Sequence, residues 1–148
     1  MITKKAKYAL KALLELTATY ETKKPVLIAV LAQRGRIPKK FLELILLELK
    51  NKGILESRKG KGGGYLLAKS PAQIMIGPVL RIIDGPLAPL PCLSQTAYRR
   101  CDECVDEAAC SIRLVLKDVH DHQIQVLDNT SLECMSERGC SVAVNYAI

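Results

Sequence analysis

Four of the six cysteines lie within one short stretch of the chain, and their spacing is typical of a metal site. They are Cys92, Cys101, Cys104 and Cys110, in the pattern C-x8-C-x2-C-x5-C. In the reducing cytoplasm, where we expect this chain to act, such a group indicates metal ligation or redox chemistry rather than a disulfide framework. Thiolates bind iron–sulfur clusters and zinc about equally well, so the pattern predicts a metal site without selecting the metal.

Two other uses of cysteine compete with a metal site. A redox enzyme would place its C-x2-C motif after a βαβ pattern in basic surroundings, whereas Asp102, Glu103 and Asp106 make these surroundings acidic. Two further alternatives stay open: the cysteines bind a structural zinc ion, or they are free thiols that bind nothing. Asp106 and Glu107 also resemble the first turn of a helix, whose N-terminus would stabilise thiolates nearby.

The basic charge is concentrated in the N-terminal half of the chain. The net charge is +7, but residues 1–69 hold sixteen Lys and Arg against five Asp and Glu, whereas residues 70–148 hold six against ten. A basic half of this strength predicts a polyanionic partner, because pairing with phosphates releases condensed counterions. An acidic protein partner is the alternative that charge alone leaves open.

Apolar residues at helical spacing predict three helices in the basic half. The first follows Thr3 as its N-cap, and the second covers Val26 to about Arg34. The third starts at Pro38, which is followed by two lysines, and it ends at Gly53. Two short helices joined by a tight turn, the second with a basic start, are typical of a helix-turn-helix whose recognition helix enters a major groove.

Glycines and basic residues fill the stretch SRKGKGGG between two short apolar runs, Ile54–Leu55 and Tyr65–Leu67. The runs predict the strands of a β-hairpin, and its tip would carry little side-chain bulk. Such a tip can approach a phosphate backbone or a narrow groove closely, where its Arg and Lys supply the attraction. A nucleotide-binding P-loop is excluded because a strand, not a helix, follows the glycines. The combination predicts a winged helix-turn-helix domain that binds DNA.

The acidic half is predicted to contain a stiff connector and a long helix. Three prolines between residues 86 and 91 lead into the cysteine loop, and apolar residues at helical spacing follow it. A helix this long on so small a domain cannot bury its apolar face alone, so we expect it to pair with a second copy of the chain. No apolar run is long enough to span a membrane.

The expected fold class is therefore mainly α with a small β-hairpin, a winged helix-turn-helix domain followed by a long C-terminal dimerisation helix. No role is predicted for Cys134 and Cys140. The expected organisation is a DNA-binding domain at 1–85, a cysteine-bearing loop at 86–110, a dimerisation helix at 107–132 and a tail at 133–148 that we expect to be disordered.

The stretch IPKKFLELILLELKNKGILESRKGKGGGYLLAKSPAQI resembles the signature of the Rrf-two family, whose members include IscR, NsrR, RirA and CymR. Its most specific parts are the I-P-x-x-F-L-E-x-I-L run and the R-x-G-K-G-G-G-Y wing, and the likeness extends from Thr3 to about Leu132. The resemblance implies a homodimeric winged-helix repressor, not an enzyme, that binds a palindromic promoter site in double-stranded DNA. It also implies that the cysteine loop senses iron–sulfur or redox status.

The resemblance places base contacts at the start of the recognition helix and backbone contacts near Lys7 and Tyr8. Glu43 suits a base contact, because a carboxylate can accept a hydrogen bond from the cytosine amino group. The chain departs from the family pattern at two places. Lys59 stands where many members have arginine. In the turn before Ile37, family members usually have glycine directly before the isoleucine, whereas this chain has Gly35 followed by Arg36. The predicted DNA-binding residues are Lys7, Tyr8, Lys39, Lys40, Glu43, Arg58, Lys59, Gly60, Lys61 and Gly62.

For the cysteine loop, the resemblance implies an iron–sulfur cluster, with 2Fe–2S favoured over 4Fe–4S. Cys92, Cys104 and Cys110 match the three cysteines of cluster-binding members, and Cys101 is an additional candidate ligand. Members with a histidine ligand place it where this chain has Arg113, so all-cysteine ligation or an open coordination position follows. The alternatives are zinc, or no cofactor at all with control by thiol oxidation or by a partner protein.

Overall fold

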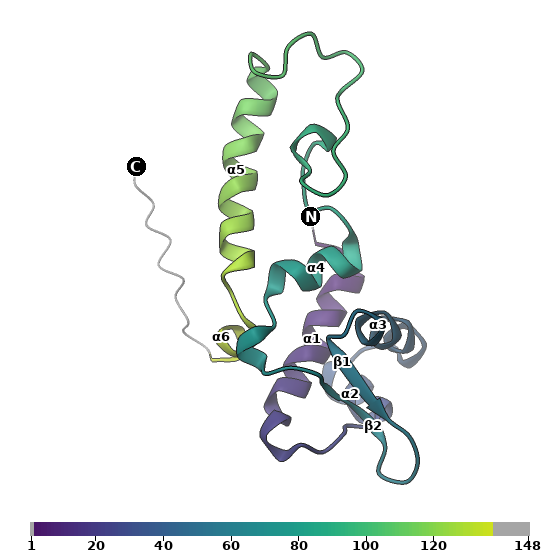
Figure 1. Cartoon of the computed structure of the whole chain (residues 1–148). Coiled ribbons are helices and arrows are strands. Elements are labelled where there is room, and N and C mark those ends of the chain that lie inside the picture. Colours follow the sequence, from purple (N-terminus) through teal and green to yellow (C-terminus); the bar gives the residue numbers. More distant parts are fainter. Residues whose placement is uncertain (1, 138–148) are drawn as a thin grey trace.

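The computed structural model describes residues 2–137, and it is mainly helical with one antiparallel hairpin and a long C-terminal helix (Figure 1). These features confirm the predicted fold class. The elements in chain order are α1 (Lys4–Ala18), η1 (Tyr20–Thr22), α2 (Ile28–Gly35), α3 (Lys39–Asn51), β1 (Leu55–Arg58), β2 (Gly64–Leu67), η2 (Pro71–Gln73), α4 (Ile76–Asp84), η3 (Pro91–Leu93), α5 (Ser111–Asp128) and α6 (Leu132–Ser136), where η marks a short 3-10 helix.

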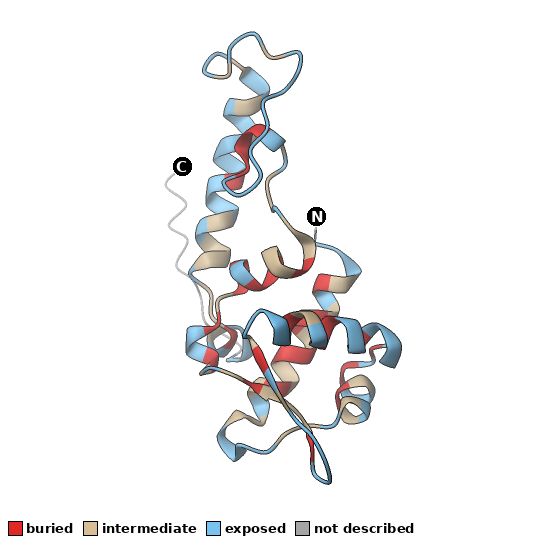
Figure 2. Cartoon of the chain, turned by 45° about the vertical axis from the view of Figure 1, so that its right-hand side comes forward, coloured by how far each residue is buried: buried red, intermediate tan, exposed pale blue. Residues whose placement is uncertain are grey.

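Helix α1 is the centre of the hydrophobic core. It begins where the sequence predicts, because the Thr3 hydroxyl accepts a hydrogen bond from the Ala6 N–H at 3.1 Å and caps the first turn. It packs against α2, α3, α4 and α6, and buried residues gather where these helices meet (Figure 2). Its own buried residues are Ala6, Ala9, Leu10, Ala12, Leu13 and Leu16.

The turn between α2 and α3 explains the exchange of glycine and arginine noted in the sequence. Gly35 is buried, and a Cβ there would lie 2.8 Å from the Ile37 side chain. Its carbonyl oxygen accepts a hydrogen bond from Lys11 at 2.8 Å. Arg36 instead adopts the left-handed conformation, with a φ of 51°, that helix ends usually assign to glycine. Packing against Ile37 thus favours glycine at position 35, one residue before the turn, and the backbone strain falls on Arg36.

The hairpin is anchored to the segment in front of α2. Val26 and Tyr65 form an antiparallel bridge, with N–H to C=O distances of 2.8 and 2.9 Å, so α2 starts at Ile28 rather than at Val26 as predicted. Gly64 has a φ of 144°, and a Cβ on it would overlap the Val26 carbonyl oxygen. A Cβ on Gly63 would likewise overlap the carbonyl oxygen of Arg58. These two glycines therefore shape the hairpin itself, a role that the sequence did not indicate.

Helix α5 is joined to the rest of the fold mainly through its C-terminal end. Two hydrogen bonds of 2.7 and 2.9 Å link Arg81 of α4 to Asp128 of α5, and Met75 bridges Ser131 just beyond the helix. From there α5 extends away from the core, with the cysteine loop at its far end (Figure 1). The helix starts at Ser111, not at residue 107.

A local turn accounts for this late start of α5. The Asp106 carboxylate accepts a hydrogen bond from the Ala108 N–H at 2.9 Å, a contact that competes with helix formation. Cys110 is consequently the N-cap residue, and Cys104 lies in the loop instead of beside the helix end.

Most of α5 is open to solvent, since His120 is its one buried residue (Figure 2). The predicted tail begins inside α6, which carries Cys134, whereas Cys140 lies outside the described residues. Among residues 2–137 no helix is long and apolar enough to cross a bilayer.

Candidate nucleic-acid interface and cysteine site

Helix α3 has one buried face and one exposed face. The buried face consists of Leu42, Ile45, Leu46 and Leu49. The three residues predicted to contact bases, Lys39, Lys40 and Glu43, are all exposed. Within the described residues none of these three side chains forms an ion pair, so their charges are free to meet a partner.

The hairpin tip is exposed from Arg58 to Gly62. Arg58 ends β1, and the loop that follows contains the exposed Lys59, Gly60, Lys61 and Gly62 and then the buried Gly63. Gly60 and Gly62 have φ values of 91° and 79° and open space around them. The tip and α3 lie at the same end of the molecule, opposite the cysteine loop (Figure 1). The arrangement meets the geometric requirement for a wing, while the contacts of individual residues with DNA stay predictions.

The first helix joins the same surface through an aromatic contact. The Tyr8 ring meets the Phe41 ring of α3 edge-on, with 5.8 Å between ring centroids and an interplanar angle of 82°. Lys7 beside it is exposed. The Lys5 ammonium also lies 2.6 Å from the Glu48 carboxylate of α3. Helices α1 and α3 are therefore linked by both an aromatic contact and an ion pair.

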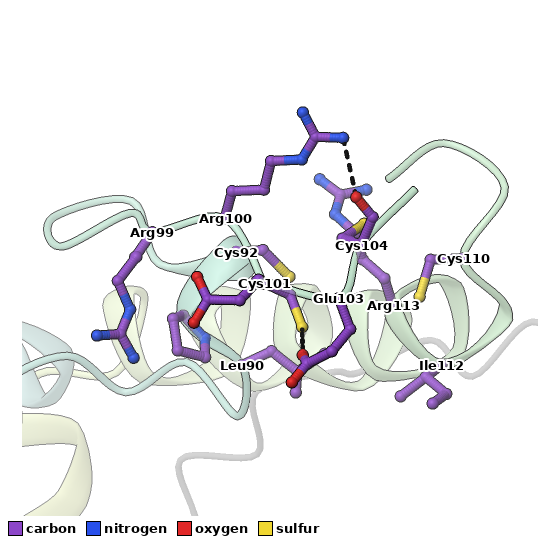
Figure 3. Close-up of a pocket in the computed structure, with 12 residues that line it drawn as sticks. Leu90, Cys92, Arg99, Arg100, Cys101, Glu103, Cys104, Cys110, Ile112 and Arg113 are labelled. Carbon is purple, nitrogen blue, oxygen red and sulfur yellow. Dashed lines mark hydrogen bonds between the residues drawn. The ribbon is translucent and has the colours of Figure 1, made fainter. Parts of the chain in front are cut away.

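All four predicted metal-ligating cysteines line one pocket between the connector and the start of α5 (Figure 3). Its volume is about 490 Å³. Cys92 is buried, Cys101 is exposed, and Cys104 and Cys110 are half-buried. The fold thus gathers around one cavity four residues that are spread over the loop and both its ends.

Polar contacts hold the loop around this pocket. The Arg100 guanidinium donates to the carbonyl oxygens of Cys104 and Val105 at 3.1 and 3.0 Å. The Cys101 thiol donates to the Glu103 carboxylate at 3.1 Å, a hydrogen bond that raises the pKa of Cys101 and lowers that of Glu103. Ligation of a metal by Cys101 would require this hydrogen bond to break.

The pocket is also lined by three arginines, Arg99, Arg100 and Arg113. Within residues 2–137 the Arg113 Nε atom is buried without a hydrogen-bond partner, and the Glu107 carboxylate lies 3.9 Å from it. These cations oppose the acidic residues of the loop and would favour thiolates or an anionic group in the cavity. The sequence analysis missed them, although two adjacent arginines before Cys101 were a visible signal.

The donor set fits an iron–sulfur cluster or zinc by chemistry, because four thiols meet at one cavity with cations nearby. Their present positions are more open than a bound group requires. Within residues 2–137, no three His, Cys, Asp or Glu side chains stand close enough together to hold a metal ion. Ligation would require the loop to close around the group.

The chain is similar to known proteins over almost its full length. The Rrf2 family, described as an iron-dependent transcriptional regulator, matches residues 2–138. An rrf2-like HTH-type transcriptional regulator from Rhodobacter capsulatus is 48% identical over 141 residues, which cover 94% of each chain. The HTH-type transcriptional regulator IscR from Cronobacter sakazakii is 30% identical over 88% of this chain and 76% of its own.

A solved structure has the same fold. CymR, the global cysteine regulator of Bacillus subtilis, superposes with a TM-score of 0.78 at 26% identity, covering 94% of this chain and 98% of its own. With this coverage, the likeness extends beyond the helix-turn-helix into the C-terminal half of the chain.

Proposed function

The chain belongs to the Rrf2 family of transcriptional regulators and is not an enzyme, and we propose that it is a cytoplasmic homodimeric repressor. It binds a palindromic promoter site in double-stranded DNA and responds to iron–sulfur or redox status through the cysteine pocket. The observation that carries the proposal is the pairing of the lysine-headed helix α3 with the exposed basic hairpin at one end of the molecule.

The two elements have different tasks on the duplex. Lys39, Lys40 and Glu43 are exposed on the N-terminal part of α3, the part of a recognition helix that reaches base edges. The hairpin tip carries cations and little bulk, which suits contact with phosphates or a narrow groove. Base contacts select the site, and phosphate contacts supply most of the affinity.

Helix α5 supports the homodimer. Val115 and Val119 are four positions apart and 66% and 59% exposed, and Ile112 on the same helix is 67% exposed. An apolar stripe of this length is covered most simply by the same helix of a second copy, in a two-fold interface. Two copies then present two recognition helices, which matches a palindromic site.

The cysteine pocket is the proposed sensor. Cys92, Cys104 and Cys110 would hold an iron–sulfur cluster, with Cys101 as a further candidate ligand, and 2Fe–2S is favoured over 4Fe–4S. When bound, such a cluster supplies a redox-sensitive and oxygen-sensitive group. Cys101 is the least suited of the four, because it is exposed and its thiol already donates to the Glu103 carboxylate.

A series of polar contacts connects the sensor to the DNA-binding surface. Arg81 ties α5 to α4 through Asp128. Asp84, the last residue of α4 and three positions after Arg81, accepts hydrogen bonds from the backbone and side chain of Thr3, the cap of α1. Helix α1 then contacts α3 through the Lys5 ion pair. Regulation requires that the loaded and empty states differ in contacts along this route.

A second form of the proposal has no cofactor, and the pocket then responds through thiol oxidation or through a partner protein. The hydrogen bond that the Cys101 thiol donates to Glu103 fits this form. Similarity to CymR, a global cysteine regulator, points the same way. A structural zinc is a third possibility for the same thiols.

Absorption spectra and metal analysis of anaerobically purified protein separate these forms. A cluster predicts visible absorption with iron and sulfide, which Cys92→Ala and Cys110→Ala abolish, while Cys101→Ala leaves most of it. Stoichiometric zinc in a colourless protein would refute the cluster. DNA affinity that responds to oxidants in a protein free of iron and zinc would establish the cofactor-free form.

Footprinting followed by fluorescence anisotropy tests the DNA-binding surface. Lys61→Glu should weaken binding to every duplex. It should also reduce the slope of the logarithm of affinity against the logarithm of salt concentration by at least about 1. Glu43→Ala should leave the salt dependence unchanged and relax the preference at one base position. Equal effects of the two variants on all sequences would contradict the assignment of their roles.

A further inference from the structure

Two leucines on the outer face of α3 are exposed, although the same helix buries its other leucines completely. Leu44 and Leu47 have exposed fractions of 64% and 50%, whereas Leu42, Leu46 and Leu49 have 0%. The two exposed residues are three positions apart and therefore neighbours on the helix surface. Single exposed leucines are ordinary in proteins, but here two adjoin within the recognition helix.

The leucines continue the stripe that the predicted base-contacting residues begin. Leu44 follows Lys40 by four positions, and Leu47 follows Glu43 by four. Four residues of the stripe, Lys40, Glu43, Leu44 and Leu47, are exposed. From the helix start inward, the outer face of α3 changes from cationic to apolar.

The charges around the leucines select the kind of partner that covers them. Lys39 and Lys40 precede the apolar pair on α3, and neither is in an ion pair within the described part of the chain. The hairpin tip adds Arg58, Lys59 and Lys61 at the same end of the molecule. An apolar pair next to cations suits a partner that combines anionic groups with apolar ones. The major groove of DNA has this pattern where thymine presents its methyl group between two phosphate backbones.

We propose that Leu44 and Leu47 contact thymine methyl groups in the major groove and so specify A·T base pairs next to the base that Glu43 contacts. This inference rests on the proposed function, because it requires α3 to be the recognition helix. It adds a second determinant of sequence to that function. Glu43 reads by hydrogen bonding, and the leucines read by burial of a methyl group that no other base presents in the major groove.

Deoxyuridine tests the contact, because it differs from thymidine only in lacking the methyl group. In the footprinted operator, each thymidine of one half-site is replaced in turn, and affinity for the full-length wild-type protein is measured by anisotropy. We expect one or two positions at which the replacement weakens binding by about 4-fold, the effect of losing one buried methyl group. Leu44→Ala should weaken binding to the unmodified operator and remove the sensitivity at one of these positions, and Leu47→Ala should do so at its neighbour.

Val105→Ala is the matched control, since Val105 is 94% exposed and lies in the cysteine loop at the opposite end of the molecule. It should keep the wild-type affinity and deoxyuridine profile. Leucine variants that retain the full wild-type profile would overturn the inference while leaving the proposed function intact. A wild-type protein that distinguishes no duplex from any other would instead overturn the proposed function, and the inference with it.

Discussion

Gly64→Ala should detach the hairpin from the segment in front of α2 and thereby weaken DNA binding. Gly64 has a φ of 144°, and an added Cβ would overlap the Val26 carbonyl oxygen and lie 2.9 Å from the Leu27 nitrogen. All the nearest atoms are backbone, so no side-chain rotation relieves the overlap. The hairpin must move, and the bridge between Val26 and Tyr65 is the first contact to break.

The expected loss of stability is the sum of the broken hydrogen bonds and the backbone strain. The bridge has two backbone hydrogen bonds, of 2.8 and 2.9 Å, and each contributes about 1 kcal/mol. An L-residue at this positive φ costs about a further 1–2 kcal/mol. The expected decrease in the free energy of unfolding is therefore about 3–4 kcal/mol, or roughly 6–16 °C in Tm for a chain of this size.

Gly62→Ala is the matched control at the hairpin tip. Gly62 also has a positive φ, of 79°, but nothing lies within 4 Å of its added Cβ, so only the conformational cost of about 1–2 kcal/mol applies. Urea unfolding gives the two free energies, and amide exchange at Tyr65 reports on the bridge. The explanation fails if both variants lose the same stability and the Tyr65 amide stays protected in Gly64→Ala.

Three single interactions give further predictions. The Arg81–Asp128 pair is partly exposed, with side-chain fractions of 25% and 37%, so a cycle of Arg81→Gln and Asp128→Asn should give a coupling of about 1–2 kcal/mol in urea unfolding; additive losses would contradict it. Arg36→Gly should raise the free energy of unfolding by about 0.5–1 kcal/mol by relieving the φ of 51°, and a loss of stability would show that the side chain has another role. Val119→Glu should weaken dimerisation at least about 100-fold, measured by light scattering, because it buries an unpaired charge in the proposed interface; an unchanged dimer would place the interface elsewhere.

The sequence predicted most of the local structure correctly. Apolar periodicity located α1 and α3, and the glycine-rich stretch located the hairpin, because both signals are properties of neighbouring residues. The start of α5 was missed by four residues, since the Asp106 turn is a specific side-chain contact that periodicity does not reveal. The cysteine spacing named four residues that do line one pocket, but the arginines around them were not anticipated.

The amino-acid sequence by itself determined the winged-helix architecture, the separation of a basic half from an acidic half, and the set of thiols available for ligation. Tertiary structure alone decided what Gly35 packs against in the turn before α3, and how α4 connects the far helix to α1. Those features depend on residues that meet only after folding, such as Thr3 with Asp84 and Val26 with Tyr65. Contacts between distant segments leave no periodic trace in the chain, and for that reason they became visible only in three dimensions.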